Sequence, residues 1–278
     1  MKPGVYGAAA QMDCVTGGVM ENARHICRML TEMKAQEPKL ALAVFPEMAL
    51  YGYEALEEIP EWTDAARVSR AMDLIGENCR RLELAAVVGT PWFTENGVEN
   101  SLCLAERDGR WRHVYSKCHL IRQERKAFRP GTAYTVCSTS AGVLGFLICW
   151  DCAFPEAARA CAQAGAELLA VSAAWEKCYE RQWELAACGR SLDNDIPVIA
   201  SNRVGRSGSA ELAGRSLIGD SMGNIICQAS GQQEGWVTAE LSRLCCTEIR
   251  RDFGSQPLQR LEEQGMGRRQ IGMKEGSI

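Results

Sequence analysis

Histidine and long apolar runs are scarce in this chain of 278 residues, and the chain lacks a net positive charge. With three histidines, the chain can build few sites that depend on imidazole. A formal net charge of −4 gives no electrostatic reason to bind nucleic acid or an anionic membrane. The longest clean apolar run, residues 141–150, is far shorter than the ~20 apolar residues of a membrane helix. We therefore predict a cytoplasmic protein that binds neither nucleic acid nor membrane.

Cysteine, in contrast, is abundant, with 14 residues. These cysteines show no framework spacing, and several lie within apolar segments, as Cys103 does. Because a chain of this length can bury a large core without cross-links, we interpret most of them as small buried hydrophobes in a reducing compartment. The run of small residues before Gln11 is shorter than the apolar region of a signal peptide, which also favours a cytoplasmic location.

Segments with helical and with strand-like apolar spacing alternate along the chain. The predicted helices cover residues 20–34, 63–82, 155–164 and 175–192. The predicted strands cover residues 5–10, 40–45, 84–89, 100–106, 111–116, 141–149, 167–172 and 197–202, followed by a β-meander at 215–220, 224–228 and 235–240. This order predicts an α/β fold of packed layers and one domain over residues 1–278, with a C-terminal tail after about residue 245.

Three predicted strands end next to a residue with reactive chemistry, namely Glu47, Lys117 and Cys149. If the strands are neighbours, a carboxylate, an ammonium and a thiol meet at one rim. The carboxylate can then accept the thiol proton, and the ammonium can stabilise a thiolate or an oxyanion. The helix that begins at Pro155 is expected to lower the thiol pKa through its positive dipole end. Strand-end charges are also common in solvated loops, so spacing alone leaves both interpretations open.

The blocks around these residues resemble the signature blocks of the nitrilase superfamily, the carbon–nitrogen hydrolases. They are "VFPEMAL" (44–50), "VYSKCHL" (114–120) and "LICWDCAFPEAAR" (147–159). Further similar blocks follow in the same order: "VVGTPW" (87–92), "ENSLCL" (99–104), "ERKAFRPG" (124–131), "GAELLAVSAAW" (165–175) and "IASNRVG" (199–205). The resemblance implies a four-layer α-β-β-α sandwich and a triad of Glu47, Lys117 and Cys149. It also implies a second glutamate beside the triad, for which Glu124 fits.

The resemblance implies a covalent mechanism that needs no metal and no cofactor. Glu47 would take the proton of Cys149, whose sulfur attacks the amide carbon. Lys117 and the backbone N–H of Trp150 would hold the oxyanion. Water, positioned by Glu47 and Glu124, would then hydrolyse the thioester.

Two further residues are candidates for the substrate pocket, and one metal site is a rival interpretation. Trp175 follows a strand end directly, and His119 lies two residues after Lys117, which keeps it near the site. His119 is also the one histidine that could replace Glu47 as the base. The spacing of Cys149 and Cys152 is that of zinc ligands, but no second pair completes four ligands.

The substrate is the least determined part of the prediction. The Trp150-Asp151 pair and the short segment from Lys117 to Glu124 resemble amidases, so we predict hydrolysis of a small linear amide to ammonia and a carboxylic acid. The block that starts at Cys149 is also similar to carbamoylputrescine hydrolases, which keeps N-carbamoyl amines as an alternative. A nitrilase activity and a non-catalytic binding protein on this fold are the remaining alternatives. The tail after Arg250 departs from the pattern of the family.

The helices at 155–164 and 175–192 carry alanine, cysteine and tryptophan where an isolated helix would expose polar side chains. Packing against the chain's own sheet explains one apolar face on each of these helices, but it does not explain apolar residues on a second face. Relatives in the superfamily commonly pair through helices, and the resemblance implies the same here. We therefore expect a homodimer with a two-fold interface, or a larger homo-oligomer.

Overall fold

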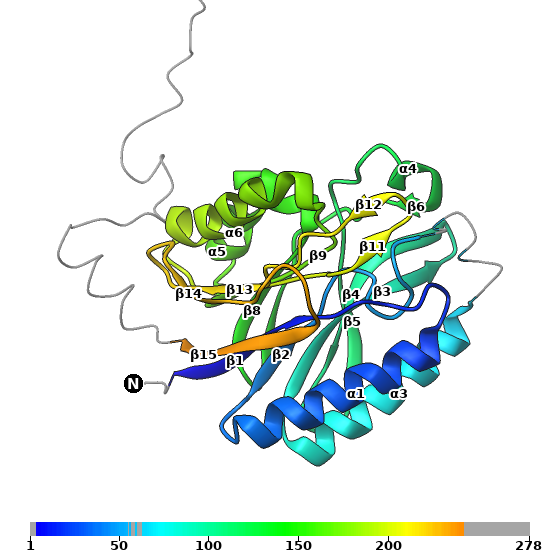
Figure 1. Cartoon of the computed structure of the whole chain (residues 1–278), viewed down its shortest axis with the longest axis horizontal. Helices are drawn as coiled ribbons and strands as arrows, with labels where there is room; N and C mark the ends of the chain where they lie inside the picture. The colour runs from blue at the N-terminus through cyan, green and yellow to red at the C-terminus, as the bar shows by residue number, and fades with distance from the viewer. Residues whose placement is uncertain (1–3, 55, 57–58, 60–62, 242–278) are drawn as a thin grey trace, which may run out of the picture.

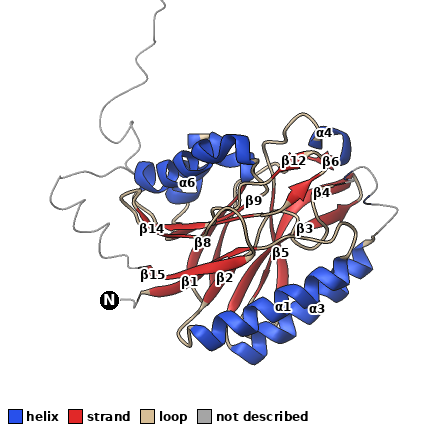
Figure 2. Ribbon diagram, in the orientation of Figure 1, coloured by secondary structure: helices blue, strands red, loops and turns tan. Residues whose placement is uncertain are grey.

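The structure is a computed structural model that describes residues 4–54, 56, 59 and 63–241. Two β-sheets lie face to face, and helices cover the outer face of each sheet (Figures 1 and 2). The layers are therefore helix, sheet, sheet and helix, and the predicted α-β-β-α sandwich is confirmed. Such layering buries the apolar face of every element against another.

Each sheet is built from strands that are far apart in the sequence. The first sheet runs in the order β15 (Gly235–Leu241), β1 (Val5–Gln11), β2 (Leu42–Val44), β3 (Ala85–Thr94), β4 (Gly97–Ala105) and β5 (Trp111–Ser116), with β6 (Phe128–Arg129) also paired to β4. The second sheet runs in the order β14 (Ile225–Gln228), β13 (Leu217–Gly219), β10 (Val198–Asn202), β9 (Leu168–Ala173), β8 (Gly142–Ile148) and β7 (Val136–Thr139).

The expected C-terminal β-meander is wrong. β13 and β14 pair with each other in the second sheet, whereas β15 leaves them and pairs antiparallel with β1 in the first sheet. All seven residues of β1 are paired in this ladder, from Val5 with Leu241 to Gln11 with Gly235. β15 thus satisfies backbone groups of β1 that would otherwise form an open sheet edge.

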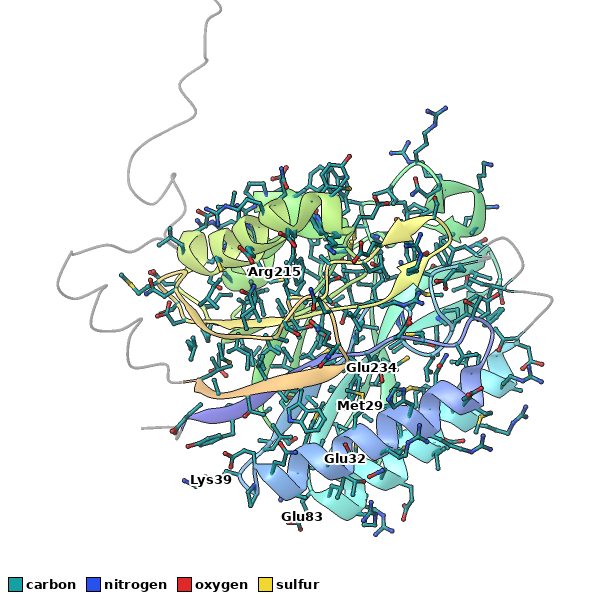
Figure 3. The ribbon with its side chains drawn as sticks, viewed as in Figure 1. Met29, Glu32, Lys39, Glu83, Arg215 and Glu234 are labelled. Atoms are coloured by element: carbon teal, nitrogen blue, oxygen red, sulfur yellow. The ribbon has the colours of Figure 1, made fainter. Side chains whose placement is uncertain are left out.

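The helices lie in pairs outside the two sheets (Figure 1). The first sheet is covered by α1 (Val19–Gln36) and α3 (Ala65–Leu82), and the second by α5 (Pro155–Gln163) and α6 (Glu180–Asn194). On α1, Met29 lies on the side of the sheet and is buried, whereas Glu32 is exposed (Figure 3). Shorter elements connect these layers: α4 (Glu124–Ala127), β11 (Arg206–Ser207) and β12 (Ala210–Glu211).

Alternation along the strands of the first sheet divides the core between its two faces. On β2 and just after it, Leu42 and Val44 pack in the cluster between the sheets, while Ala43 and Phe45 pack against α1 and α3. This period of two is the geometry of a strand whose faces are both buried.

The helix predicted from residue 175 begins only at Glu180. Trp175 donates its backbone N–H to Asn202 Oδ1 at 2.7 Å, and Glu176 forms an isolated antiparallel bridge with Leu212. The chain is extended at Glu176, with φ −71° and ψ 147°. These contacts with distant segments hold residues 175–176 out of the helix, which local apolar spacing does not reveal.

Among the described residues, no helix is long and apolar enough to cross a membrane. The predicted tail after residue 245 lies outside the described residues.

The homodimer stays a prediction, and exposed apolar side chains on α6 support it. Leu185 and Leu192 are 56% and 55% exposed and lie seven residues apart on one helix face, while Trp183 is fully buried against the chain's own sheet. We expect light scattering at micromolar concentration to give about twice 30.5 kDa, and Leu185→Glu with Leu192→Glu to lower that mass. A single species of 30.5 kDa in the unmodified protein would contradict the prediction.

Candidate active site

Glu47 follows β2 on a tight turn that lies against β3. The residue after it, Met48, has a positive φ of 53°, and Leu50 donates its N–H to the carbonyl of Gly89 at 3.0 Å. A Cβ on Gly89 would lie 2.3 Å from the carbonyl oxygen of Pro46, so only glycine allows this approach. The turn places the Glu47 side chain in the interior, where it is fully buried.

Lys117 follows β5 directly and is fixed from both sides. Its N–H donates to the carbonyl of Asn100 at 2.8 Å, and its own carbonyl accepts the N–H of Gly131 at 2.8 Å. A Cβ on Gly131 would lie 2.1 Å from the carbonyl oxygen of Ser116, so the segment can lie this close to β5 only with glycine there. The Lys117 side chain is fully buried.

Two carboxylates share the buried Lys117 ammonium. Its Nζ lies 2.7 Å from Glu47 Oε1 and 2.8 Å from Glu124 Oε1. Asn100 Nδ2 donates to the same two oxygens, at 2.7 and 2.9 Å. The other oxygens accept backbone N–H groups, from Ala174 to Glu47 and from Ile121 to Glu124, both at 2.9 Å. Every carboxylate oxygen therefore has a donor, as buried charge requires.

Cys149 lies at the junction of β8 and the 3-10 helix η2 (Cys149–Ala153). Its φ is +47°, a left-handed conformation that is uncommon for a residue with a Cβ. The side chain is 8% exposed, and its ionisation responds to the charges of Glu47, Lys117 and Glu124. The turn thus places the thiol near enough to the carboxylate–ammonium cluster for its charges to act on it.

Asp151 holds this turn from within the protein, a role that the sequence analysis, which used Asp151 only as a sign of the substrate class, did not predict. Its Oδ2 accepts the Tyr115 hydroxyl at 2.8 Å and the Ile148 N–H at 3.0 Å. Its Oδ1 accepts the backbone N–H of His119 at 2.9 Å and lies 2.9 Å from the ring Nδ1. Asp151 is fully buried, so the Asp in the Cys-Trp-Asp sequence anchors the turn that presents Cys149.

The structure does not bring His119 into the pocket. Its ring stacks on Phe154 with 3.7 Å between centroids, and its Nδ1 faces Asp151. His119 is therefore placed to orient the turn rather than to contact a substrate. Asn100, which sequence reasoning also missed, occupies the centre of the cluster; its one signal is its place in the block "ENSLCL".

The electrostatics of the cluster differ from the sequence-based expectation. Burial raises the pKa of the Cys149 thiol well above its ordinary value, the Glu47 charge raises it further, and Lys117 offsets only part of this. Burial and the charge of Glu124 raise the Glu47 pKa, against the pull of Lys117. The expected lowering of the thiol pKa is therefore wrong, because burial beside two carboxylates outweighs the ammonium and the helix that begins six residues later.

A cavity of about 990 Å³ opens over Cys149. Trp150 is 41% exposed and Trp175 is 6% exposed, and both line it, with 5.8 Å between their ring centroids. The described residues that line the cavity are Tyr53, Leu56, Ile121, Gln123, Cys149, Trp150, Ala174, Trp175, Glu176, Tyr179, Gln182, Ser207, Ser209, Ala210 and Leu212. Trp175, the pocket candidate from the sequence, thus lies at the cavity with Trp150, and a substrate contact by either residue stays a prediction.

The zinc interpretation finds no support in the side-chain arrangement. Within the described residues, no three His, Cys, Asp or Glu side chains are grouped so that they could hold a metal ion. Cys152 is fully buried in the core, and burial raises its pKa strongly, as expected for a structural thiol.

Replacement of Asp151 by alanine should destabilise the fold. The change leaves buried donors of Tyr115, Ile148 and His119 without an acceptor, so we expect the free energy of unfolding to fall by about 3 kcal/mol in urea denaturation. Asp193→Ala, which removes a half-exposed ion pair with Arg190, is the matched control and should cost under about 1 kcal/mol. Equal losses in the two variants would contradict the anchoring role.

Comparisons with known proteins agree with this geometry. The family model described as Carbon-nitrogen hydrolase matches residues 8–251. The chain is 32% identical over 234 residues to the probable nitrilase C965.09 of Schizosaccharomyces pombe, which covers 83% of this chain and 86% of that protein. It is 30% identical over 194 residues to an N-carbamoylputrescine amidase of Arabidopsis thaliana, which covers 62% of this chain and 65% of that protein. The crystal structure of a carbon-nitrogen hydrolase from Helicobacter pylori superposes with a TM-score of 0.84 at 25% identity, covering 93% of this chain and 96% of that one. The chain belongs to the carbon-nitrogen hydrolase family of the nitrilase superfamily.

Proposed function

We propose that this hydrolase cleaves the C–N bond of a small linear amide through a thioester on Cys149. The observation that carries the proposal is the buried cluster of Glu47, Lys117 and Glu124, whose charges act on Cys149, a residue at a positive φ that lines the cavity. A carboxylate beside the thiol supplies the base, and the ammonium supplies a fixed positive charge.

The first half of the reaction forms the thioester. Because burial raises the pKa of the Cys149 thiol, Glu47 accepts its proton as the sulfur attacks the amide carbon. Negative charge then develops on the amide oxygen, within reach of Lys117 and of the Trp150 N–H. That N–H lies in the first turn of η2, where backbone donors have no helical acceptor. The proton held by Glu47 passes to the leaving nitrogen, and ammonia departs.

The second half consumes water. Glu47, ionised again, removes a proton from a water molecule whose oxygen attacks the thioester carbon. The C–S bond breaks, the sulfur recovers a proton, and the carboxylic acid leaves. One amide and one water thus give one acid and one ammonia.

A second candidate is the hydrolysis of an N-carbamoyl amine. The similarity to the Arabidopsis thaliana N-carbamoylputrescine amidase and the block that begins at Cys149 support it. Attack of the Cys149 sulfur would then break one C–N bond, expel ammonia or the amine and form a carbamoyl thioester. Hydrolysis of that thioester would give a carbamic acid that decomposes to carbon dioxide and the other nitrogen compound, so one N-carbamoyl amine and one water give an amine, ammonia and carbon dioxide. Measurement of carbon dioxide beside ammonia therefore separates the two candidates.

Cys149→Ala should abolish turnover without unfolding the protein. We expect kcat on an amide panel to fall by roughly 10³-fold or more, because the covalent route is lost. The circular dichroism spectrum should be retained, because the thiol faces a cavity and adds little packing. Mass spectrometry of the unmodified enzyme with a slowly deacylated amide should show an adduct on Cys149. Undiminished turnover in folded Cys149→Ala would refute the proposed function.

Glu124→Gln should change both the rate and its pH dependence. Loss of one Lys117 contact disturbs the alignment, so kcat should fall by about 100-fold. The charge of Glu124 raises the Glu47 pKa, and Glu47 must be ionised to act as the base. Its removal therefore lowers the Glu47 pKa and moves the acid limb of kcat/KM to lower pH. An acid limb that stays in place or moves to higher pH would contradict this coupling.

A further inference from the structure

The cavity wall carries a formal charge at one position among the described lining residues, and that residue is Glu176. The rest of the described lining consists of aromatic, aliphatic and neutral polar side chains together with the Cys149 thiol, without Lys, Arg or His. A carboxylate-bearing substrate would therefore meet no cation on the described wall. A cationic substrate would meet Glu176.

The Glu176 carboxylate is available to a ligand. Its recorded contact within the described part of the chain is the Cys178 thiol at 3.5 Å, a weak donor. Basic side chains that flank it in the sequence are paired elsewhere: Lys177 lies 2.5 Å from Glu211, and Arg181 lies 3.6 Å from Glu184. The charge on the wall is thus not neutralised by these neighbours.

Backbone pairing fixes the position of Glu176 on the cavity wall. Glu176 is bridged to Leu212, and the neighbouring Trp175 carbonyl accepts the N–H of Ala213 at 2.8 Å. Ala174 donates its N–H to Glu47 Oε2 at 2.9 Å, and Glu176 follows two residues later, so the backbones of Ala174 and Glu176 are at most about 7 Å apart. A short methylene chain spans such a separation.

The rest of the site has the same electrostatic preference. Two carboxylates, Glu47 and Glu124, surround one ammonium, so the cluster does not offset the negative charge of the wall. Trp150, Trp175 and Tyr179 line the same cavity, and aromatic rings attract cations that lie over their faces.

The geometry points to Glu176 as a specificity-determining residue that selects substrates with a cationic remote end, an ammonium carried on a short aliphatic chain. This inference rests on the proposed function, because it names the substrate class of the same site. It applies equally to an amide and to an N-carbamoyl amine, since the two differ at the reacting end and share the remote end.

The test compares three amides of nearly equal length that differ in the remote charge: 6-aminohexanamide, hexanamide and adipic acid monoamide. At low ionic strength we expect kcat/KM to rank them in that order. Glu176→Gln should lower the ratio of kcat/KM for 6-aminohexanamide over hexanamide by about tenfold, the loss of one partly buried charge pair. Glu176→Lys should shift the preference toward the monoamide.

Glu180→Gln is the matched control, because it removes the same charge four residues away, from a side chain outside the described lining. It should retain the ratio of the unmodified enzyme. The same comparison with N-(4-aminobutyl)urea and N-pentylurea covers the carbamoyl candidate. An unmodified enzyme without preference for the ammonium compound, or a Glu176→Gln enzyme with an unchanged ratio, would overturn the inference.

Binding to Cys149→Ala separates this inference from the proposed function. We expect nuclear magnetic resonance titrations to give a lower Kd for 6-aminohexanamide than for hexanamide, and the difference should disappear when Glu176→Gln is added. If this preference is found but the unmodified enzyme turns over none of the compounds, the proposed function fails and the specificity stands. If all three amides are hydrolysed equally, the specificity fails and the proposed function stands.

Discussion

The buried ammonium of Lys117, shared by Glu47 and Glu124, is the interaction on which the rest of the site depends. Desolvation of three ionised groups costs several kcal/mol for each, so such a cluster exists only where each charge has close partners. One ammonium cannot neutralise two carboxylates, and the Asn100 amide and backbone N–H groups stabilise the excess. Burial, and after it the charge of Glu47, raise the pKa of the Cys149 thiol, which disfavours a free thiolate in this site. In the proposed mechanism, proton transfer to Glu47 therefore accompanies the attack of the sulfur and does not precede it.

The sandwich is what allows such a cluster to form. Glu47, Asn100 and Lys117 come from the first sheet, whereas Cys149 and Ala174 come from strand ends of the second. Neither sheet alone brings the thiol to the base, so the reaction depends on how the two sheets are packed. A site formed along one sheet edge does not depend on a second sheet. Here the core between the two sheets fixes the distances between Cys149 and the cluster, and that core is close-packed and resists displacement.

The sequence predicted the parts of this arrangement that depend on local pattern. The positions of Glu47, Lys117 and Cys149 at strand ends predicted that these residues meet. The superfamily resemblance predicted the sandwich and the second glutamate, Glu124. The pairing of β15 with β1 depends on contacts between opposite ends of the chain, and the late start of α6 depends on Asn202 and Leu212; local spacing carries neither. Asp151 and Asn100 were missed because they are polar residues of ordinary type, and only burial shows that they hold the site.

Chemistry and selectivity are carried by different kinds of position in this protein. A change at Glu47 or Asn100 leaves buried polar groups without partners, so the cluster tolerates little variation. Glu176 lies on the cavity wall, on a backbone held by pairing with Leu212, and its side chain contributes little to that pairing. Substitution at such a position costs little stability. Substitutions on the cavity wall can therefore change substrate preference while the buried cluster is retained. The charge variants at Glu176 would measure how far substrate preference is independent of the cluster.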